Sequence, residues 1–437
     1  MATTIPTRQL RRPTVGRARG VARETATVRV AFAVIALHLV DDAFVHPESG
    51  TAMGDHFASG LVPTAMAVLL ATAYPRLGNG WQAATAIGSG VLALVGGVGI
   101  SARHVVIDRL AGDDLTGILA GLAGIMLIGC GIHAAGCAWR AQSRRVTPAR
   151  RALRRLAVAL AVLLGVVFVV FPAALSILAT HKARAPVAAA DLGRPYEQVS
   201  FRTSDGLVLQ GWYVPSRNRA AVITFPGRSG PVPHARMLVR HGYGVLLFDR
   251  RGEGASQGDF NAFGWEGERD LTAALRYLTT RTDVDRTRIG GIGLSVGGEL
   301  LLQTAADSSS LRAVVADGAG MRSLRDHLAL DTRGPISWIS PLVMQTAATA
   351  VLSNGFPPPA LLDLMPRIAH RAVFLIFAGK GQGGEDRNPD YYAAARQPKQ
   401  LWEIPEAGHT GGLATRPAEY ERRVVAFFDQ YLLGKAR

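Results

Sequence analysis

Two serines of the chain stand in a Gly-x-Ser-x-Gly pattern, whose glycines permit a sharp strand-to-helix turn that exposes the serine hydroxyl. The pattern occurs at 293–297, around Ser295, and at 254–258, around Ser256. Ser295 follows a run typical of a buried strand and precedes a run typical of a helix, whereas no helix is expected to start after Ser256. We therefore expect Ser295 to be a nucleophile and Ser256 to be a loop serine.

A serine hydroxyl becomes a good nucleophile only when a base removes its proton, and the usual base is a histidine oriented by a carboxylate. His409 is the candidate base because the glycine-rich loop at 405–412, after the last expected strand, can present its side chain. The loop after the preceding strand offers two acids. Glu385 is preferred because its longer side chain can reach the histidine, whereas Asp386, the alternative, can pair with Arg387 or cap the next helix.

The chain order Ser295, Glu385, His409 is the one expected of α/β-hydrolases. Residues 196–437 resemble a serine hydrolase of this superfamily, from the group of serine aminopeptidases, dienelactone hydrolases and prolyl-oligopeptidase-like enzymes. The resemblance rests on the motif around Ser295 and on three other runs: Asp-Gly-Leu at 205–207, Asp-Arg-Arg-Gly-Glu-Gly-Ala-Ser at 249–256 and Ala-Gly-His at 407–409. It implies acyl transfer through Ser295, without a metal or an organic cofactor.

The resemblance also implies where the negatively charged oxygen of a tetrahedral intermediate would bind. Two backbone N–H groups normally stabilise this oxygen, and by resemblance they belong to Val296, after the nucleophile, and to Arg228. The family commonly has His-Gly where this chain has Pro226 and Gly227. This difference removes a side-chain contact, and we expect the backbone donor of Arg228 to stay available.

The strands and helices that must position these residues are predicted from short β-rich runs that alternate with helical patterns in the sequence. Strands are expected at 197–203, 207–214, 220–225, 244–248, 288–293, 312–317, 372–378 and 400–404, and helices at 265–280, 296–306 and 418–433. This predicts a mostly parallel, eight-stranded α/β-hydrolase sheet. The stretch at about 321–367 interrupts the alternation, so we expect it to be a helical lid insertion over the carboxyl edge of the sheet.

The residues before this domain predict an α-helical membrane region. Five stretches approach or reach the roughly 20 apolar residues that cross a bilayer, namely 28–45, 57–74, 83–101, 115–138 and 156–180. We therefore divide the chain into a basic cytoplasmic N-terminus (1–27), a five-helix transmembrane region (28–180), a linker (181–195) and the hydrolase domain (196–437).

The charge of the chain is unevenly placed. Its 437 residues include 48 Lys and Arg against 33 Asp and Glu, and residues 1–185 alone hold 19 against 8. The basic residues concentrate before the first span and in the connection at 139–155, which indicates cytoplasmic segments and argues against nucleic-acid binding. Five spans then predict a multi-pass protein of the cell membrane with an extracytoplasmic hydrolase domain. The only two cysteines, Cys130 and Cys137, lie outside this domain, so no disulfide bonds are expected in it.

The first span carries ionisable residues, which are costly inside a bilayer. A helix would stack His38, Asp42 and His46 on one face, with Asp41 close by. Histidine and aspartate can bind a metal ion, but the outer end of a short span also lets such residues reach headgroups and water. We predict no metal site, and the sequence leaves the role of these residues open.

These patterns together predict a membrane-anchored serine hydrolase that cleaves an ester, either a simple acyl ester or a lipid-derived one. Its expected partners are a small-molecule substrate and the lipid bilayer. The alternatives are a serine peptidase acting on short peptides, a non-catalytic binding or scaffold module, and membrane spans that bind or move a small molecule themselves. The sequence leaves the oligomeric state open.

Overall fold

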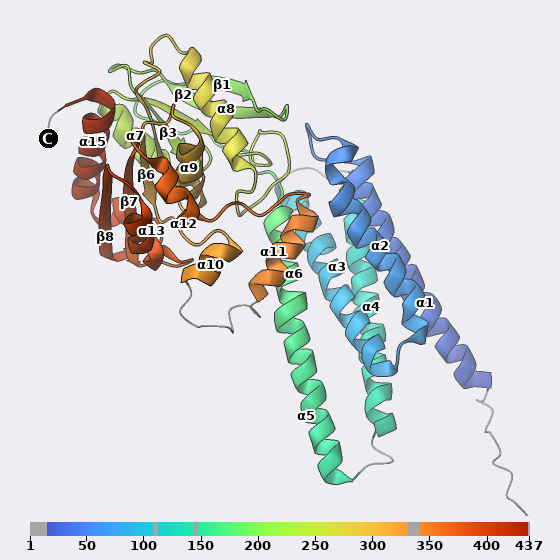
Figure 1. Cartoon of the computed structure of the whole chain (residues 1–437). Coiled ribbons are helices and arrows are strands. Elements are labelled where there is room, and N and C mark those ends of the chain that lie inside the picture. Colours follow the sequence, from blue (N-terminus) through green and yellow to red (C-terminus); the bar gives the residue numbers. More distant parts are fainter. Residues whose placement is uncertain (1–14, 108–111, 143–146, 331–340, 436–437) are drawn as a thin grey trace, which may run out of the picture.

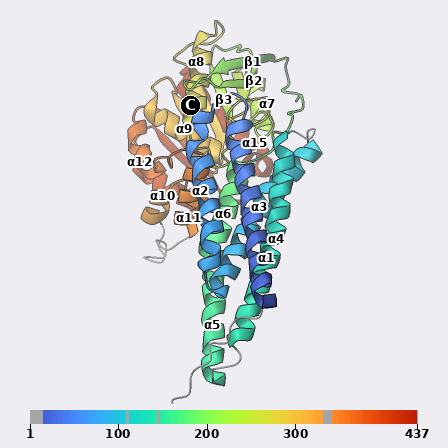
Figure 2. The ribbon, with the colours of Figure 1, turned by 90° about the vertical axis from the view of Figure 1, so that its right-hand side faces the viewer.

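The computed structural model describes residues 15–107, 112–142, 147–330 and 341–435. The N-terminal helices form an elongated bundle, and the rest of the chain forms an α/β domain at one end of it (Figure 1). A view turned by 90° shows the same arrangement, with the opposite end of the bundle pointing away from the α/β domain (Figure 2).

The bundle begins with α1 (Val15–Val40), which continues into a π-helical turn, η1 (Asp41–Val45). Then follow η2 (Met53–His56), α2 (Phe57–Ala73), η3 (Tyr74–Arg76), α3 (Asn79–Ile107) and α4 (Gly112–Gln142). The last helix is one rod made of α5 (Pro148–Gly165), η4 (Val166–Val170) and α6 (Phe171–Thr180).

Among the described residues, 4 helical segments are long and apolar enough to cross a membrane: Met53–Arg76, Asn79–Gly99, Asp114–Arg140 and Pro148–Thr180. They correspond to the second to fifth predicted spans. Helix α1, which contains most of the first predicted span, is not among them. It nevertheless packs into the bundle, because Val28, Ala31 and Phe32 are buried in one apolar cluster with Ala67 of α2 and Leu127 of α4. The five-span arrangement stays a prediction.

Helices α3 and α4 approach each other closely along a row of glycines. A Cβ added to Gly97 would lie 2.2 Å from the carbonyl oxygen of Gly117, and one added to Gly90 would lie 2.6 Å from that of Gly124. Small residues let helix backbones come together, which is how van der Waals packing stabilises helix pairs in membranes. The glycine pattern of these two segments therefore has a packing role.

The α/β domain is built on one sheet of 8 strands in the order β1-β2-β4-β3-β5-β6-β7-β8. Strand β2 pairs antiparallel with both β1 and β4, and the other neighbours are parallel. The strands are β1 (Glu197–Arg202), β2 (Val208–Val214), β3 (Ala221–Phe225), β4 (Gly244–Phe248), β5 (Ile289–Leu294), β6 (Ala313–Asp317), β7 (Ala372–Lys380) and β8 (Lys399–Gly408).

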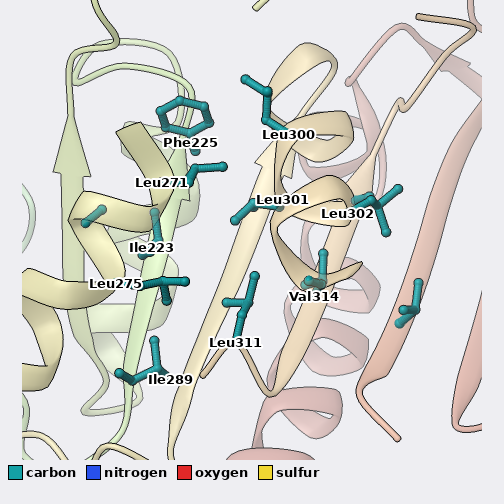
Figure 3. Packing of buried hydrophobic residues seen from close by; sticks show 14 of the residues in the cluster. Ile223, Phe225, Leu271, Leu275, Ile289, Leu300, Leu301, Leu302, Leu311 and Val314 are labelled. Atoms are coloured by element: carbon teal, nitrogen blue, oxygen red, sulfur yellow. The ribbon is translucent and has the colours of Figure 1, made fainter. Parts of the chain in front are cut away.

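Helices cover both faces of the sheet, and each face buries its own apolar cluster. On one face, α8 (Gly267–Thr280) and α9 (Val296–Asp307) pack Leu271 and Leu301 against Ile223 of β3 (Figure 3). On the other face, α7 (Val232–Arg240) and α15 (Pro417–Leu433) pack against Val222, because successive side chains of a strand point to opposite faces. Two short helices, α13 (Asn388–Ala394) and α14 (Gly412–Thr415), flank β8.

A helical segment separates β6 from β7. It contains α10 (Leu324–Leu330), α11 (Pro341–Leu352), α12 (Leu361–Leu364) and η6 (Met365–Ile368). The predicted fold, a helical apolar region followed by a mostly parallel eight-stranded α/β-hydrolase sheet, is confirmed. The segment between β6 and β7 is helical as expected, and its action as a lid stays a prediction.

The linker at 181–195 is packed on the rest of the molecule. Ala183 and Leu192 are buried. The Arg184 guanidinium donates hydrogen bonds to Glu48, 2.8 Å away, and to the carbonyl of Gly258, 2.7 Å away. These contacts fix the α/β domain against the loop that joins η1 to α2.

Candidate active site

Ser295 occupies a tight turn between β5 and α9. Its backbone has φ 51° and ψ −124°, a conformation that costs a non-glycine residue roughly 1–3 kcal/mol. Three hydrogen bonds hold the turn: Ser295 N–H donates to the carbonyl of Asp317 at 2.8 Å, and Gly298 and Glu299 N–H donate to the Ser295 carbonyl at 2.9 and 3.2 Å. The surrounding fold therefore stabilises the strained turn that the sequence motif predicts.

The two glycines that flank Ser295 in the motif are required because the turn leaves no room for a side chain at either position. A Cβ on Gly293 would lie 2.4 Å from the carbonyl oxygen of Gly297, and a Cβ on Gly297 would lie 2.7 Å from the carbonyl oxygen of Phe225 in β3. Any larger residue at either position would push the turn away from the sheet. The motif thus describes a real packing constraint at Ser295.

His409 directly follows β8, and its Nδ1 contacts Oε1 of Glu385 in η7 (Glu385–Arg387). The Glu385 carboxylate is fully buried, and its Oε2 accepts a hydrogen bond of 2.9 Å from the Ala378 backbone N–H. Because both oxygens are engaged, the carboxylate has a fixed orientation. With Nδ1 held by Glu385, Nε2 is the ring nitrogen left for proton transfer.

The end of β6 brings the three candidate residues together. Ser295 N–H bonds to Asp317, and a Cβ added to the next residue, Gly318, would lie 3.3 Å from Cε1 of His409 and 3.4 Å from Cδ of Glu385. Within the described residues, the Ser295 hydroxyl has no hydrogen-bond partner. Catalytic hydrogen bonds often tighten only when substrate binds, so the missing hydrogen bond leaves Ser295 a candidate nucleophile.

Buried carboxyl groups shape the electrostatics of the site. The pKa of His409 is raised, first by its hydrogen bond to Glu385 and further by the negative charges of Glu385, Asp317 and Glu299. Burial raises the pKa of Asp317 to about 7, although its hydrogen bond from Tyr420 acts in the opposite direction. Burial also raises the pKa of Glu299, which accepts the Gly320 N–H at 3.1 Å. The surroundings therefore favour the positive form of the His409 ring.

The two expected oxyanion donors differ in their surroundings. Val296 is the first residue of α9, where backbone N–H groups have no partner within the helix. The Arg228 N–H instead donates to Oδ1 of Asp249 at 3.1 Å, and the Arg228 guanidinium forms a buried ion pair with the same carboxylate at 2.6 Å. This corrects the expectation that the Arg228 donor is available. The physical reason is that β3 and β4 are neighbours, which places Asp249 beside the loop after β3.

The competing candidates lie in ordinary structural environments. Ser256 is fully buried; its hydroxyl donates to the Asp249 carbonyl at 2.7 Å and accepts the Gln210 N–H at 2.9 Å. Asp386 is 73% exposed and pairs with Arg387 at 3.3 Å. Another histidine of the domain, His241 at the end of α7, contacts Glu421 at 2.8 Å. None of these contacts involves Ser295 or His409.

Sequence reasoning missed Asp317 and Tyr420 as part of this site. Asp317 ends β6 and is buried, and its Oδ2 accepts a hydrogen bond of 2.7 Å from the Tyr420 hydroxyl of α15. The available signal is an Asp-Gly pair at the end of a buried strand, because the carboxyl ends of parallel strands meet at one edge of a sheet.

The ionisable residues of the first predicted span pair with one another and with neighbouring elements. Oδ1 of Asp41 contacts His46 at 3.1 Å, and its Oδ2 accepts a hydrogen bond of 2.7 Å from Thr116, which also contacts His38 at 3.1 Å. Asp42 lies 3.9 Å from His181. In the described part of the chain, no group of three or more His, Cys, Asp or Glu side chains is arranged to hold a metal ion.

Comparison with known proteins agrees with this architecture. Residues 171–367 match the family of X-Pro dipeptidyl-peptidases (S15 family). The chain is 32% identical over 246 residues to the uncharacterized protein YfhR of Escherichia coli (strain K12), which covers 53% of this chain and 80% of YfhR.

Two solved structures are also similar. The esterase Pf2001 of Pyrococcus furiosus covers 57% of this chain and 98% of its own, with 21% identity and a TM-score of 0.46. The similarity to the α/β-hydrolase GrgF of Penicillium sp. sh18 covers 55% of this chain and 100% of GrgF, with 22% identity and a TM-score of 0.44. From the strand order, the turn at Ser295 and the extended similarity to YfhR, we conclude that the chain belongs to the α/β-hydrolase superfamily of serine hydrolases.

Proposed function

We propose that this protein is a membrane-anchored serine hydrolase that cleaves a carboxylic ester through Ser295, His409 and Glu385. The observation that carries the proposal is the buried, doubly held Glu385 carboxylate against His409, beside the strained turn of Ser295. A carboxylate in that position holds the imidazole in one orientation and stabilises its protonated form.

The reaction proceeds in two halves. Nε2 of His409 takes the proton of the Ser295 hydroxyl while the serine oxygen attacks the ester carbonyl, and the Val296 N–H stabilises the resulting oxyanion. The C–O bond to the alcohol then breaks, and His409 gives its proton to the departing alcohol. Water next attacks the acyl-enzyme, again with His409 as base, and releases the carboxylic acid and free Ser295.

A peptidase is the second candidate function, because the family model that matches residues 171–367 is one of dipeptidyl-peptidases. We favour an ester because the helical segment between β6 and β7 contains an apolar helix, α11, that packs against the membrane helix α6. Purified protein assayed with acyl esters of increasing chain length beside aminoacyl amides separates the two functions.

The assignment of Ser295 is tested with Ser295→Ala and Ser256→Ala in full-length protein. We expect Ser295→Ala to abolish hydrolysis of a small aryl ester and labelling by a fluorophosphonate probe, whereas correctly folded Ser256→Ala keeps the labelling. Labelling that persists in Ser295→Ala would overturn the proposal.

We further propose five membrane spans, with the hydrolase domain outside the cytoplasm. The packing of α1 inside the helix bundle and the basic residues at 1–27 and 139–155 support this topology. A phosphatase fused after Arg437 is expected to be active in intact cells, because this reporter works outside the cytoplasm. A fusion reporter that is active only in the cytoplasm would contradict the topology.

A further inference from the structure

One loop contacts both the turn at Ser295 and the last turn of α6, which ends the fifth predicted span. The loop lies between β4 and α8, where the Ala262 N–H donates a hydrogen bond of 2.8 Å to the carbonyl of Ala179 in α6. Two residues later, a Cβ added to Gly264 would lie 2.7 Å from Cγ2 of Val296, the neighbour of Ser295. The same loop therefore joins the turn at Ser295 to the end of the fifth predicted span.

Helix α11 lies along α6 at the same end of the bundle (Figures 1 and 2). The Ser176 hydroxyl donates to the Gln345 carbonyl at 3.0 Å and accepts from Thr349 at 3.1 Å, and both Ser176 and Thr349 are buried. Just past the C-terminal end of α11, the Asn354 side chain accepts a hydrogen bond of 3.1 Å from Ala58 N–H in the first turn of α2. Helix α11 is thus fixed to two predicted spans.

The composition of α11 suits contact with hydrocarbon. The helix has 12 residues, none of them charged, and it exposes 42% of Val343 and 38% of Met344. At about 1.5 Å per residue it is roughly 18 Å long, too short to cross a bilayer of about 30 Å. On α6, Phe171 and Leu178 are exposed as well, at 55% and 49%. The length and composition of α11 suit a position in the leaflet next to the α/β domain.

The segment that carries α11 also reaches the catalytic residues. At its base, the Asp326 carboxylate accepts the N–H groups of Leu361 and Leu362 at 3.1 and 3.2 Å. Met321 N–H donates at 3.1 Å to the carbonyl of Gly383, two residues before Glu385. Beyond the C-terminal end of α11, a Cβ on Gly355 would meet the Trp265 ring at 3.8 Å, in the loop that covers Val296.

A second contact joins the same edge of the sheet to the helix bundle. Gly258 N–H, in the loop after β4, donates at 2.9 Å to the carbonyl of Ser49, which lies between η1 and α2. Arg184 joins this loop to Glu48. The carboxyl edge of the parallel strands, where α/β sheets bind their ligands, therefore faces the helix bundle.

We propose that the substrate is an ester with a long acyl chain held in the leaflet next to the α/β domain, and that this chain reaches Ser295 along α11 without leaving the membrane. The proposal rests on the proposed ester hydrolase function. It commits to bilayer lipid as the occupant of the exposed face of α11, because that face is uncharged and because α11 packs along α6, which also exposes apolar side chains.

The first test compares two substrates in full-length protein reconstituted into phosphatidylcholine vesicles. One is a water-soluble acetyl aryl ester, and the other is a fluorogenic long-chain diacylglycerol ester in the bilayer. Met344→Gln is expected to lower turnover of the bilayer ester by about tenfold, equivalent to about 1.4 kcal/mol of lost apolar contact, and to leave the soluble ester unchanged. The control is Leu156→Gln, an exposed apolar residue at the opposite end of the long helix, which should change neither rate.

The second test locates α11. Met344→Cys, in a background with Cys130→Ser and Cys137→Ser, is labelled with an environment-sensitive fluorophore. We expect quenching by lipids that carry a nitroxide on the acyl chain and no quenching by aqueous iodide. A label at Ser309→Cys, at the opposite edge of the sheet, should show the reverse.

Iodide quenching at position 344, or a Met344→Gln effect that is absent or equal on both substrates, overturns the proposed lipid entry. The proposal is supported if Met344→Gln lowers turnover of the bilayer ester alone and if lipid nitroxides quench the label at position 344. Failure of the unaltered protein to cleave the soluble ester would instead refute the proposed hydrolase function, so the two failures are distinguishable.

Discussion

The backbone N–H of Ser295 donates a hydrogen bond of 2.8 Å to the carbonyl of Asp317, which ties the nucleophile turn to the end of the neighbouring strand β6. The side chain of the same aspartate accepts the Tyr420 hydroxyl, and its charge acts on His409. Asp317 thus influences both the position of Ser295 and the protonation of His409.

Asp317→Asn is expected to change the pH dependence of stability. Burial raises the Asp317 pKa from 3.8 to about 7, so the folded state binds this proton more tightly than the unfolded state. The stabilisation is complete below pH 4 and is lost as pH rises through about 7. Asparagine cannot titrate but still accepts the Tyr420 hydrogen bond. The Tm of the variant relative to wild type should therefore be higher at pH 8 than at pH 5. An equal Tm difference at both pH values would contradict this.

Glu385→Ala is expected to lower kcat by on the order of a thousandfold or more, because His409 loses the group that orients it and stabilises its charge. Asp386→Ala is the matched control, since its side chain is exposed, and it should keep kcat within about twofold. Steady-state hydrolysis of a soluble aryl ester measures both rates. Equal losses in the two variants would show that Glu385 has no special role.

Glu385→Gln is expected to shift the acid limb of the pH–rate profile. His409 must be neutral to act as a base, and its pKa is raised mainly by the hydrogen bond to Glu385. The midpoint of the acid limb of wild-type kcat/KM should therefore lie above pH 6.5. For the residual activity of Glu385→Gln, this midpoint should lie at a lower pH. A limb that does not move would mean that another group titrates.

The buried pair of Arg228 and Asp249 is expected to matter for stability. Asp249→Ala leaves the Arg228 guanidinium buried without a carboxylate partner, which costs about 3–5 kcal/mol and should lower Tm by roughly 6–20 °C. The double variant Arg228→Met and Asp249→Leu removes both charges and should recover most of that loss. Melting in detergent compares them, and a double variant no more stable than Asp249→Ala would contradict this account.

Gly97→Ala should loosen the helix bundle, because the added Cβ would lie 2.2 Å from the Gly117 carbonyl oxygen. Gly99→Ala is the control, since a Cβ there meets nothing within 4 Å. We expect lower thermal stability in detergent for Gly97→Ala only. The same Tm in both variants would show that α3 and α4 tolerate the extra separation.

Most of the sheet is predictable because buried parallel strands form short continuous apolar runs, such as 244–248 for β4. The end of β8 is not predictable in this way, since Pro405 suggests that the strand stops. Pairing with β7 continues after an irregularity between Ala378 and Lys380, and Lys380 pairs with Gly408. This extension places His409 directly after the strand.

The site is only partly predictable, because neighbouring strands need not be neighbours in sequence. The pairing of β3 with β4 brings Asp249 to the Arg228 N–H, and the pairing of β5 with β6 brings Asp317 to Ser295. No spacing along the chain contains that information. Likewise, the choice between Glu385 and Asp386 depends on burial, which the local sequence does not determine.

In the proposed membrane topology, the long helix formed by α5, η4 and α6 (the rod) would link bilayer thickness to the position of Ser295. Its 33 residues span about 50 Å. Near one end lie Arg150, Arg151, Arg154 and Arg155, and at the other end Ala179 contacts the loop between β4 and α8. Those arginines resist entering hydrocarbon, so the rod sets the height of Ser295 above the lipid. In membranes of different thickness, hydrophobic mismatch would raise, lower or tilt the whole enzyme.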